Sequence, residues 1–196
     1  FMEILWSNLD RARWDEAHVH AGGAWQQDWA YGEAIVRIGG RVLRAEVREG
    51  GKTLALAQFT WRRFSGFFNG ALCTRGPVWA APLEAKAKAQ IYAGLKRTAP
   101  LARPRAIMFT PDEPATGPIG VERMVKVMTG HATVVLHLAQ PLEALRAGLH
   151  GKWRNRLVAA EKAGLKVLFN GAKPGQYQWL LDKEAEQRRA VGYRAH

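Results

Sequence analysis

Two cations at helical spacing are the residues of this sequence best suited to bind a charged ligand. Lys152 and Arg156 stand four residues apart in the segment LHGKWRNRLVAAEKAGLKV, residues 149–167. In a helix they are neighbours, and their repulsion costs about a few tenths of a kcal/mol. A bound anion would remove that cost, and Gly151 leaves backbone N–H groups at a helix start as further donors. The pattern predicts a phosphate or carboxylate site; the alternative is that both side chains extend into solvent over apolar neighbours.

An apolar stripe runs beside these cations. Its members follow one another at intervals of three or four residues: Leu142, Leu145, Leu149, Trp153, Leu157 and Ala160. This spacing predicts one buried face on a helix over residues 141–164, interrupted near Gly148 and Gly151. Arg154 points away from the stripe. Together with the pair and Lys162, it would form a basic face suited to tRNA or to a lipid headgroup.

Arg75 is a further candidate contact for an anion. It lies in Thr74-Arg75-Gly76-Pro77, which ends an expected strand over residues 65–73 because proline cannot continue the ladder of hydrogen bonds. The alternative is that Arg75 only braces the end of this strand. Cys73 could act as a nucleophile only if a base met it in space, and its position favours a small buried residue instead.

The remaining residues give no catalytic or metal-binding set. His18 and His20 have no nearby Cys or His to complete a site, and His131 and His137 on one strand face would stand about 20 Å apart. Neither H-E-x-x-H nor G-x-S-x-G occurs in the sequence. We therefore predict no metal ion and assign no catalytic residue.

Helices and strands alternate along the chain. After a polar helical stretch that ends at Gly22-Gly23, the periodicity predicts helices at 25–38, 83–98, 141–164 and 177–191, and strands at 2–6, 42–47, 53–61, 65–73, 105–109, 125–138 and 166–169. Gly50-Gly51 is expected to join two of the strands as a hairpin. The order predicts an α/β fold in which helices flank a mixed central sheet.

Composition limits the class of protein. Lys plus Arg number 29 against 17 Asp plus Glu in 196 residues, which gives a formal net charge of +12 and a pI near 10.3. This excess favours anionic partners such as nucleic acid, nucleotide phosphates or anionic lipid. The single cysteine excludes an internal disulfide framework. No apolar run approaches the ~18 residues of a membrane span, and the N-terminus lacks a signal-peptide pattern, so we expect a cytoplasmic protein.

The charge is uneven along the chain. Residues 141–196 hold 11 Lys and Arg against 5 Asp and Glu, so this part is more than twice as basic per residue as the rest. We expect one domain over residues 2–140. Residues 141–196 would form a basic helical connector, a strand and the first helix of a second domain.

The basic segment resembles the helix-to-strand signature of the FemAB-type aminoacyltransferases, the enzymes that build the interpeptide bridges of peptidoglycan. The matching residues are Lys152, Arg154, Leu157, Ala160, Lys162, Gly164, Leu165 and Val167. Three earlier passages are similar to the family in the expected order: Gln26-Gln27-Asp28-Trp29 with Tyr31-Gly32, Thr74-Arg75-Gly76-Pro77-Val78, and residues 132–138 before Pro141-Leu142. Residues 177–193 are similar to the helix that opens the family's second domain, so the resemblance spans about residues 24–192.

The resemblance implies a GNAT-like (acyl-CoA N-acyltransferase) fold for residues 2–140, with the opening of a second copy after them. It implies transfer of an amino acid from aminoacyl-tRNA, or of an acyl group from another carrier, to an amine such as that of a peptidoglycan precursor. Because the donor ester is already activated, neither a covalent nucleophile nor a cofactor is needed. The residues expected to contact the polyanionic donor or the acceptor are Arg75, Lys152, Arg154, Arg156 and Lys162.

Two alternatives stay open. An N-acetyltransferase that uses acetyl-CoA usually has a Gln/Arg-x-x-Gly-x-Gly/Ala turn, and none occurs between Arg75 and Leu83. A non-catalytic module that binds RNA or other anions would need only the basic face. Detection of an amide product distinguishes the enzyme from the module.

Overall fold

The computed structural model describes residues 2–113, 119–121, 124–130, 133, 135–167, 169 and 173–192. The chain forms two compact units, Phe1–His131 and Ala132–His196. The domain boundary expected near Pro141 stays a prediction. Among the described helices, none combines the length and apolarity that a bilayer crossing requires.

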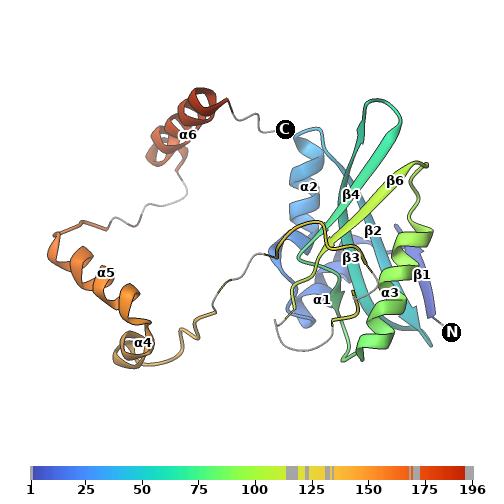
Figure 1. Cartoon of the computed structure of the whole chain (residues 1–196), viewed down its shortest axis with the longest axis horizontal. Coiled ribbons are helices and arrows are strands. Elements are labelled where there is room, and N and C mark those ends of the chain that lie inside the picture. Colours follow the sequence, from blue (N-terminus) through green and yellow to red (C-terminus); the bar gives the residue numbers. More distant parts are fainter. Residues whose placement is uncertain are drawn as a thin grey trace. The chain divides into compact units, whose positions relative to one another are not determined.

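The first unit is a sheet covered by helices (Figure 1). Its elements are β1 (Met2–Trp6), α1 (Arg11–His20), the 3₁₀ turn η1 (Trp25–Gln27), α2 (Trp29–Arg37), β2 (Arg41–Glu49), β3 (Lys52–Phe64), β4 (Phe68–Thr74), β5 (Val78–Trp79), α3 (Ala85–Thr98) and β6 (Arg105–Thr110). The strands follow the order β1-β2-β3-β4-β6, and β5 pairs with β3. All neighbours are antiparallel except β4 and β6, which are parallel and connected through α3. The expected mixed α/β architecture is thus confirmed, with mostly antiparallel strands.

The hairpin of β2 and β3 forms where Gly50-Gly51 predicted it. Glu49 pairs with Lys52, so the loop consists of these two glycines. Their φ angles are 55° and 79°, a left-handed conformation that residues with a side chain adopt only at a cost. The long strand β3 lies at the centre of the sheet, where it pairs with β2, β4 and β5.

Apolar side chains are buried on both faces of this sheet. On one face the core contains Ile91 and Leu95 of α3, packed with a cluster that includes Ala45, Val47, Ala55, Ala57, Phe59, Ala71 and Cys73. On the other face Trp14 of α1 packs with Leu56 and Val78, beside Trp29 of α2. The central strands therefore read as nearly continuous apolar runs, because both of their faces are covered.

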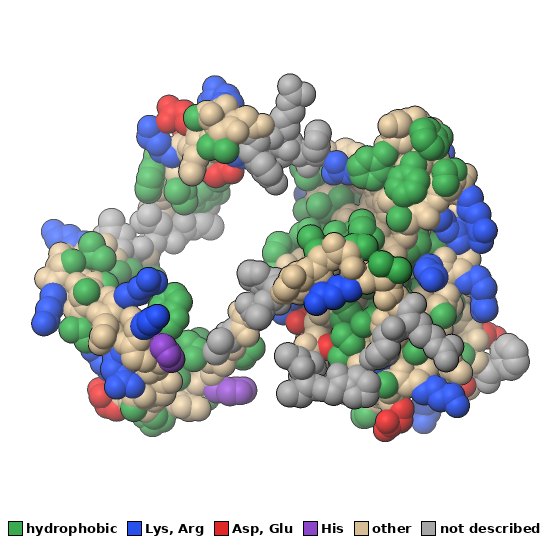
Figure 2. Space-filling view, viewed as in Figure 1, with side chains coloured by type: hydrophobic (Ala, Val, Ile, Leu, Met, Phe, Trp, Pro, Cys, Tyr) green, Lys and Arg blue, Asp and Glu red, His purple; other side chains and the backbone are tan. Residues whose placement is uncertain are grey.

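The second unit consists of short helices in its described part. These are α4 (Leu142–Gly148), α5 (Gly151–Lys162), the 3₁₀ turn η2 (Pro174–Gln176) and α6 (Gln178–Val191), and none of the α-helices has a buried residue. Trp153 is 63% exposed and Trp179 is 64% exposed. Hydrophobic side chains are accordingly visible on the surface of these helices (Figure 2).

Two expected strands are not formed where the structure describes the chain. The described residues of 125–138 and of 166–169 are not in strands, and residues 131, 132, 134 and 168 lie outside the described part. An alternating pattern becomes a strand only if a neighbouring strand completes its hydrogen bonds. Residues 166–169 belong to the second unit, whose described part contains no strand, and the described residues 125–130 of the first unit follow its last strand without pairing with the sheet. The expected helix over 141–164 is divided at Leu149, whose ψ of 136° is extended, so the apolar stripe lies on two helices.

Candidate functional site

A side-chain amide completes the hydrogen-bond ladder of β3. This strand pairs with β4 from Thr60 onward and with β5 at Leu56, which leaves Gln58 between the two pairings. The backbone N–H of Gln58 donates to Oε1 of Gln27 at 2.7 Å, and Nε2 of Gln27 donates to the Gln58 carbonyl at 3.0 Å. The Gln27 amide therefore replaces a peptide group of the missing strand.

The same amide reaches the end of β4. Nε2 of Gln27 also donates to the carbonyl of Thr74 at 2.7 Å, and the backbone carbonyl of Gln27 accepts from Nε1 of Trp14 at 2.9 Å. A Cβ at Gly76 would lie 2.7 Å from the Cδ of Gln27, so this approach requires glycine. The passages around residues 27 and 75, which are far apart in the sequence, thus meet in space.

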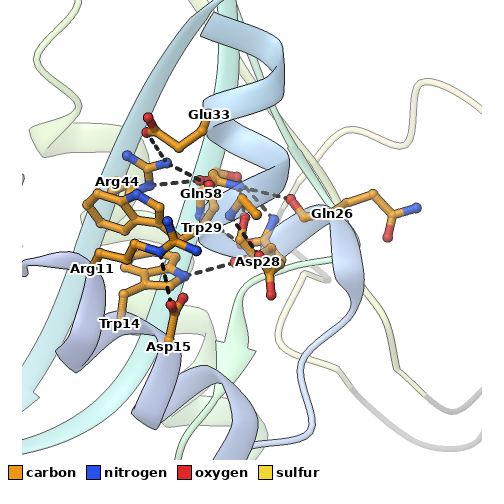
Figure 3. A network of polar contacts seen from close by, with 11 residues as sticks. Arg11, Trp14, Asp15, Gln26, Asp28, Trp29, Glu33, Arg44 and Gln58 are labelled. Carbon is orange, nitrogen blue, oxygen red and sulfur yellow. Dashed lines mark hydrogen bonds and ion pairs between the residues drawn. The ribbon is translucent and has the colours of Figure 1, made fainter. Parts of the chain in front are cut away.

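A buried polar network extends from Gln58 to Arg44 (Figure 3). Nε2 of Gln58 donates to the carbonyls of Gln26 and Asp28, at 3.1 and 2.9 Å, and its Oε1 accepts from Nε of Arg44 at 2.8 Å. The Arg44 guanidinium stacks on Trp29, with Cζ 3.5 Å from the ring centroid. Burial lowers the pKa of Arg44, while its hydrogen bond to Glu33 opposes that shift. This network fixes the turn before α2 onto the sheet.

The parallel strands β4 and β6 end side by side, at Thr74 and Thr110. In sheets with parallel strands, ligands commonly bind beyond these carboxyl ends. Arg75 follows β4 with a φ of 50°, and its backbone N–H donates to Oγ1 of Thr110 at 2.9 Å. Its guanidinium contacts Oδ2 of Asp112 at 2.7 Å, and the two side chains are 43% and 46% exposed. The predicted site residue Arg75 is therefore accessible, and it also braces the strand end.

A second ion pair at this edge is largely buried. Nζ of Lys88, on α3, lies 2.8 Å from Oε1 of Glu113, and the side chains are 15% and 9% exposed. Nε1 of Trp79 donates to the same carboxylate. This pair connects α3 with the chain after β6. Of the two paired cations at this edge, Lys88 and Arg75, Arg75 is therefore the accessible one. A guanidinium is suited to bind carboxylate or phosphate through two parallel hydrogen bonds.

Sequence analysis missed Asp112, Glu113 and Lys88. A signal for the first two was present, because they follow the expected strand 105–109 as Arg75 follows the strand 65–73. Had the two strands been recognised as parallel neighbours, these residues would have been placed at one edge. Cys73 is fully buried, and burial raises its pKa far above the usual range, so the thiol is unsuited to act as a nucleophile.

The other predicted anion contacts lie together on α5 of the second unit. All four are exposed: Lys152, Arg154, Arg156 and Lys162. An Nη of Arg154 donates to the carbonyls of Ala147 and Leu149, both at 3.0 Å, at the end of α4. Cζ of Arg156 lies 5.6 Å from the ring centroid of Trp153. The role of these cations in anion binding stays a prediction.

The described residues contain no group of three or more His, Cys, Asp or Glu that could hold a metal ion. His18 is instead bonded within the first unit, with Nε2 3.0 Å from the carbonyl of Ala24.

This chain has limited similarity to known proteins. Neither the known protein families nor the curated protein sequences match this chain. A crystal structure of FemX aligns with a TM-score of 0.37 and 16% sequence identity, over 47% of this chain and 23% of that chain. The chain therefore spans less than a quarter of the length of that protein.

Proposed function

We propose that this chain is part of an acyltransferase of FemAB type, which transfers an activated aminoacyl or acyl group to an amine. The contact between Gln27 and Thr74 carries the proposal. These residues are 47 positions apart, they belong to two passages that resemble the family, and they are joined by a hydrogen bond of 2.7 Å. If the two short passages resembled the family only by chance, there would be no reason for them to contact each other at the end of one strand.

The proposed reaction needs positioning rather than a protein nucleophile. The amine nitrogen attacks the carbonyl carbon of the donor ester, the new C–N bond forms and the C–O bond to the carrier breaks. The carrier leaves as an alcohol with the proton that the amine loses. Backbone N–H groups suffice to stabilise the developing oxyanion. The burial of Cys73 agrees with a mechanism that has no covalent intermediate.

Arg75 is the residue that we assign to substrate binding in the first unit. Its guanidinium would exchange the exposed carboxylate of Asp112 for an anionic group of the donor or acceptor. The cations of α5 would contact a polyanionic donor such as tRNA. The acceptor would be an amine such as that of a peptidoglycan precursor, and a reaction with these partners would take place in the cytoplasm.

Mass spectrometry of reaction mixtures tests this proposal. The full chain is incubated with an aminoacyl-tRNA or an acyl-CoA and with candidate amines, and the expected result is an amide formed from the aminoacyl donor. Arg75→Ala should lower its rate about tenfold or more, since a charged hydrogen-bonded contact contributes about 1.5–3 kcal/mol. The control Asp112→Asn removes the competing carboxylate and keeps the cation, so it should preserve the rate. Equal losses in both variants would indicate that Arg75 only braces the strand.

A non-catalytic anion-binding module is the second candidate. The observation that favours it is the exposure of all four cations on α5, outside any buried site in the described part of the second unit. Tight, salt-dependent binding of RNA with no amide product from any donor would support this module and contradict the enzyme.

A further inference from the structure

One end of the first unit's sheet combines exposed aromatic side chains with cations. We call it the hairpin end, formed by the turn between β3 and β4, the turn between α2 and β2, and the chain between α3 and β6. Arg41 at the start of β2 pairs with Trp61 near the end of β3. Nδ2 of Asn69, near the start of β4, donates to the carbonyl of Ala102 at 2.8 Å. These contacts bring the three segments to the same end of the sheet.

Phenylalanines occupy the tip of the β3–β4 hairpin. Phe64 is 48% exposed and Phe67 is 64% exposed. The turn between them is tight, with φ of 48° at Ser65 and 75° at Gly66. A Cβ at Gly70 would lie 2.8 Å from the ring of Phe64. The ring of Phe64 therefore occupies space that a side chain at position 70 would fill. The aromatic tip is held by the hairpin and presented to solvent.

The cations of the hairpin end lie behind this tip and have no acidic neighbours in its segments. All seven are exposed: Arg37, Arg41, Arg62, Arg63, Lys96, Arg97 and Arg103. Residues 34–45, 60–75 and 96–111 contain no Asp or Glu. Figure 2 shows hydrophobic side chains gathered at this end, with Lys and Arg along the adjacent edge. The positive potential is therefore concentrated where apolar surface is exposed.

We infer that the hairpin end docks on the surface of an anionic lipid bilayer. Arg62 precedes Phe64 by two residues on the same face of the strand, and its Cζ lies 6.0 Å from the centroid of the Phe64 ring. Interfacial anchors bury their apolar side chains about 5–10 Å into the headgroup region, with Lys and Arg at the level of the anionic headgroups. The Arg41 guanidinium, 4.8 Å from the centroid of the Trp61 ring, adds another amphipathic pair behind the tip.

The shape of the hairpin end favours a bilayer over a nucleic acid as this partner. The seven cations complement either partner. A single strand of RNA, however, stacks its bases on aromatic rings that line a basic groove, whereas Phe64 and Phe67 stand at a protruding turn in which every residue from Arg62 to Phe67 is exposed. The inference is independent of the proposed acyltransferase reaction.

A fluorescent label at the tip provides the test. Because Cys73 is fully buried, a cysteine introduced by Ser65→Cys can be labelled selectively in the full chain with an environment-sensitive dye. Lys52→Cys, at the opposite end of β3, is the matched control position. On vesicles of phosphatidylcholine with phosphatidylglycerol, the emission at position 65 should shift to the blue and that at position 52 should not. Vesicles of phosphatidylcholine alone should give no shift, and added salt should reduce it.

Variants at exposed positions separate the contribution of the aromatic tip to membrane binding from that of the cations. Phe64→Ser with Phe67→Ser should lower the partition coefficient on the anionic vesicles about tenfold or more, while Val19→Ser, a change at another exposed apolar residue, should leave it unchanged. Arg62→Glu with Arg63→Glu should also lower the partition coefficient about tenfold or more. The control Lys52→Glu with Lys86→Glu should lower it much less. Equal shifts at positions 65 and 52, or binding that the tip variants do not affect, would overturn the inference. A shift at position 65 with an RNA oligonucleotide but not with vesicles would assign the surface to nucleic acid instead.

Discussion

The two units differ in whether they bury side chains that lie on an apolar helix face. In the first unit Trp14 is fully buried, its indole N–H is bonded to Gln27, and even the polar side chains of Gln27 and Gln58 lie inside. In the second unit Trp153 occupies an apolar stripe of the expected spacing, yet it is 63% exposed. Helical periodicity therefore indicates which face can be buried, and burial itself requires a second layer to pack against.

Replacing the two tryptophans tests this contrast most directly. Trp14→Ala should destabilise the first unit by about 3–5 kcal/mol, because a large cavity is left in the core. Trp153→Ala should cost no more than about 0.5 kcal/mol, as for an ordinary exposed position. Urea unfolding followed by circular dichroism measures both. Equal losses would show that α5 is packed as tightly as α1.

Replacing glutamines extends the contrast to polar groups. Gln27→Leu removes the partner of the Gln58 peptide group and of the Thr74 carbonyl, and each buried unsatisfied group costs about 1–3 kcal/mol. We expect a loss of about 2–4 kcal/mol in unfolding free energy and faster hydrogen exchange at the Gln58 amide. The matched change Gln178→Leu affects an exposed side chain bonded to Asp182 and should cost about 0.5 kcal/mol or less. Unchanged protection at Gln58 would contradict the role of Gln27 in the ladder.

Exposed cations should matter for binding instead of stability. Lys152→Ala with Arg156→Ala should weaken RNA binding and reduce the slope of log K against log salt by about 1–2, as expected when two phosphate contacts are lost. Filter binding at several salt concentrations measures the slope. Lys183→Ala with Arg188→Ala is the control, because these cations are paired with Glu186 and Glu184. If affinity and slope match the unmodified chain, Lys152 and Arg156 form a solvated face.

The smallest effect concerns the pairing of α4 with α5. Arg146 lies 2.6 Å from Oε1 of Glu161, and this hydrogen bond lowers the pKa of Glu161. A lowered carboxyl pKa means that the pair stabilises the fold above the usual pKa of glutamate and that this contribution disappears as the pH falls through the lowered value. NMR titration should show the pKa of Glu161 rising in Arg146→Ala. An unshifted titration would mean that the pair does not form in solution.

Local signals in the sequence were sufficient for much of the first unit. The expected hairpin at Gly50-Gly51 and the expected helix over 83–98 agree with the observed turn and with α3, because turn chemistry and helical periodicity depend on residues that are close along the chain. The short strand β5 was not predicted, since its two residues carry no periodicity. For the strands expected over 125–138 and 166–169 the reason is the opposite, because their described residues have a periodic pattern but pair with no described strand.

By itself, the sequence determined the basic charge, the alternation of helices and strands, and the choice of Arg75 and the α5 cations as candidate contacts. The tertiary structure decided that Gln27 replaces a strand, that Arg75 faces Asp112, and that aromatic and basic residues from three segments share the hairpin end. Each of these depends on residues far apart in the chain, and no local pattern fixes such distances. The burial of apolar faces was also decided by the tertiary structure, because a face is buried only if another element of the fold packs against it.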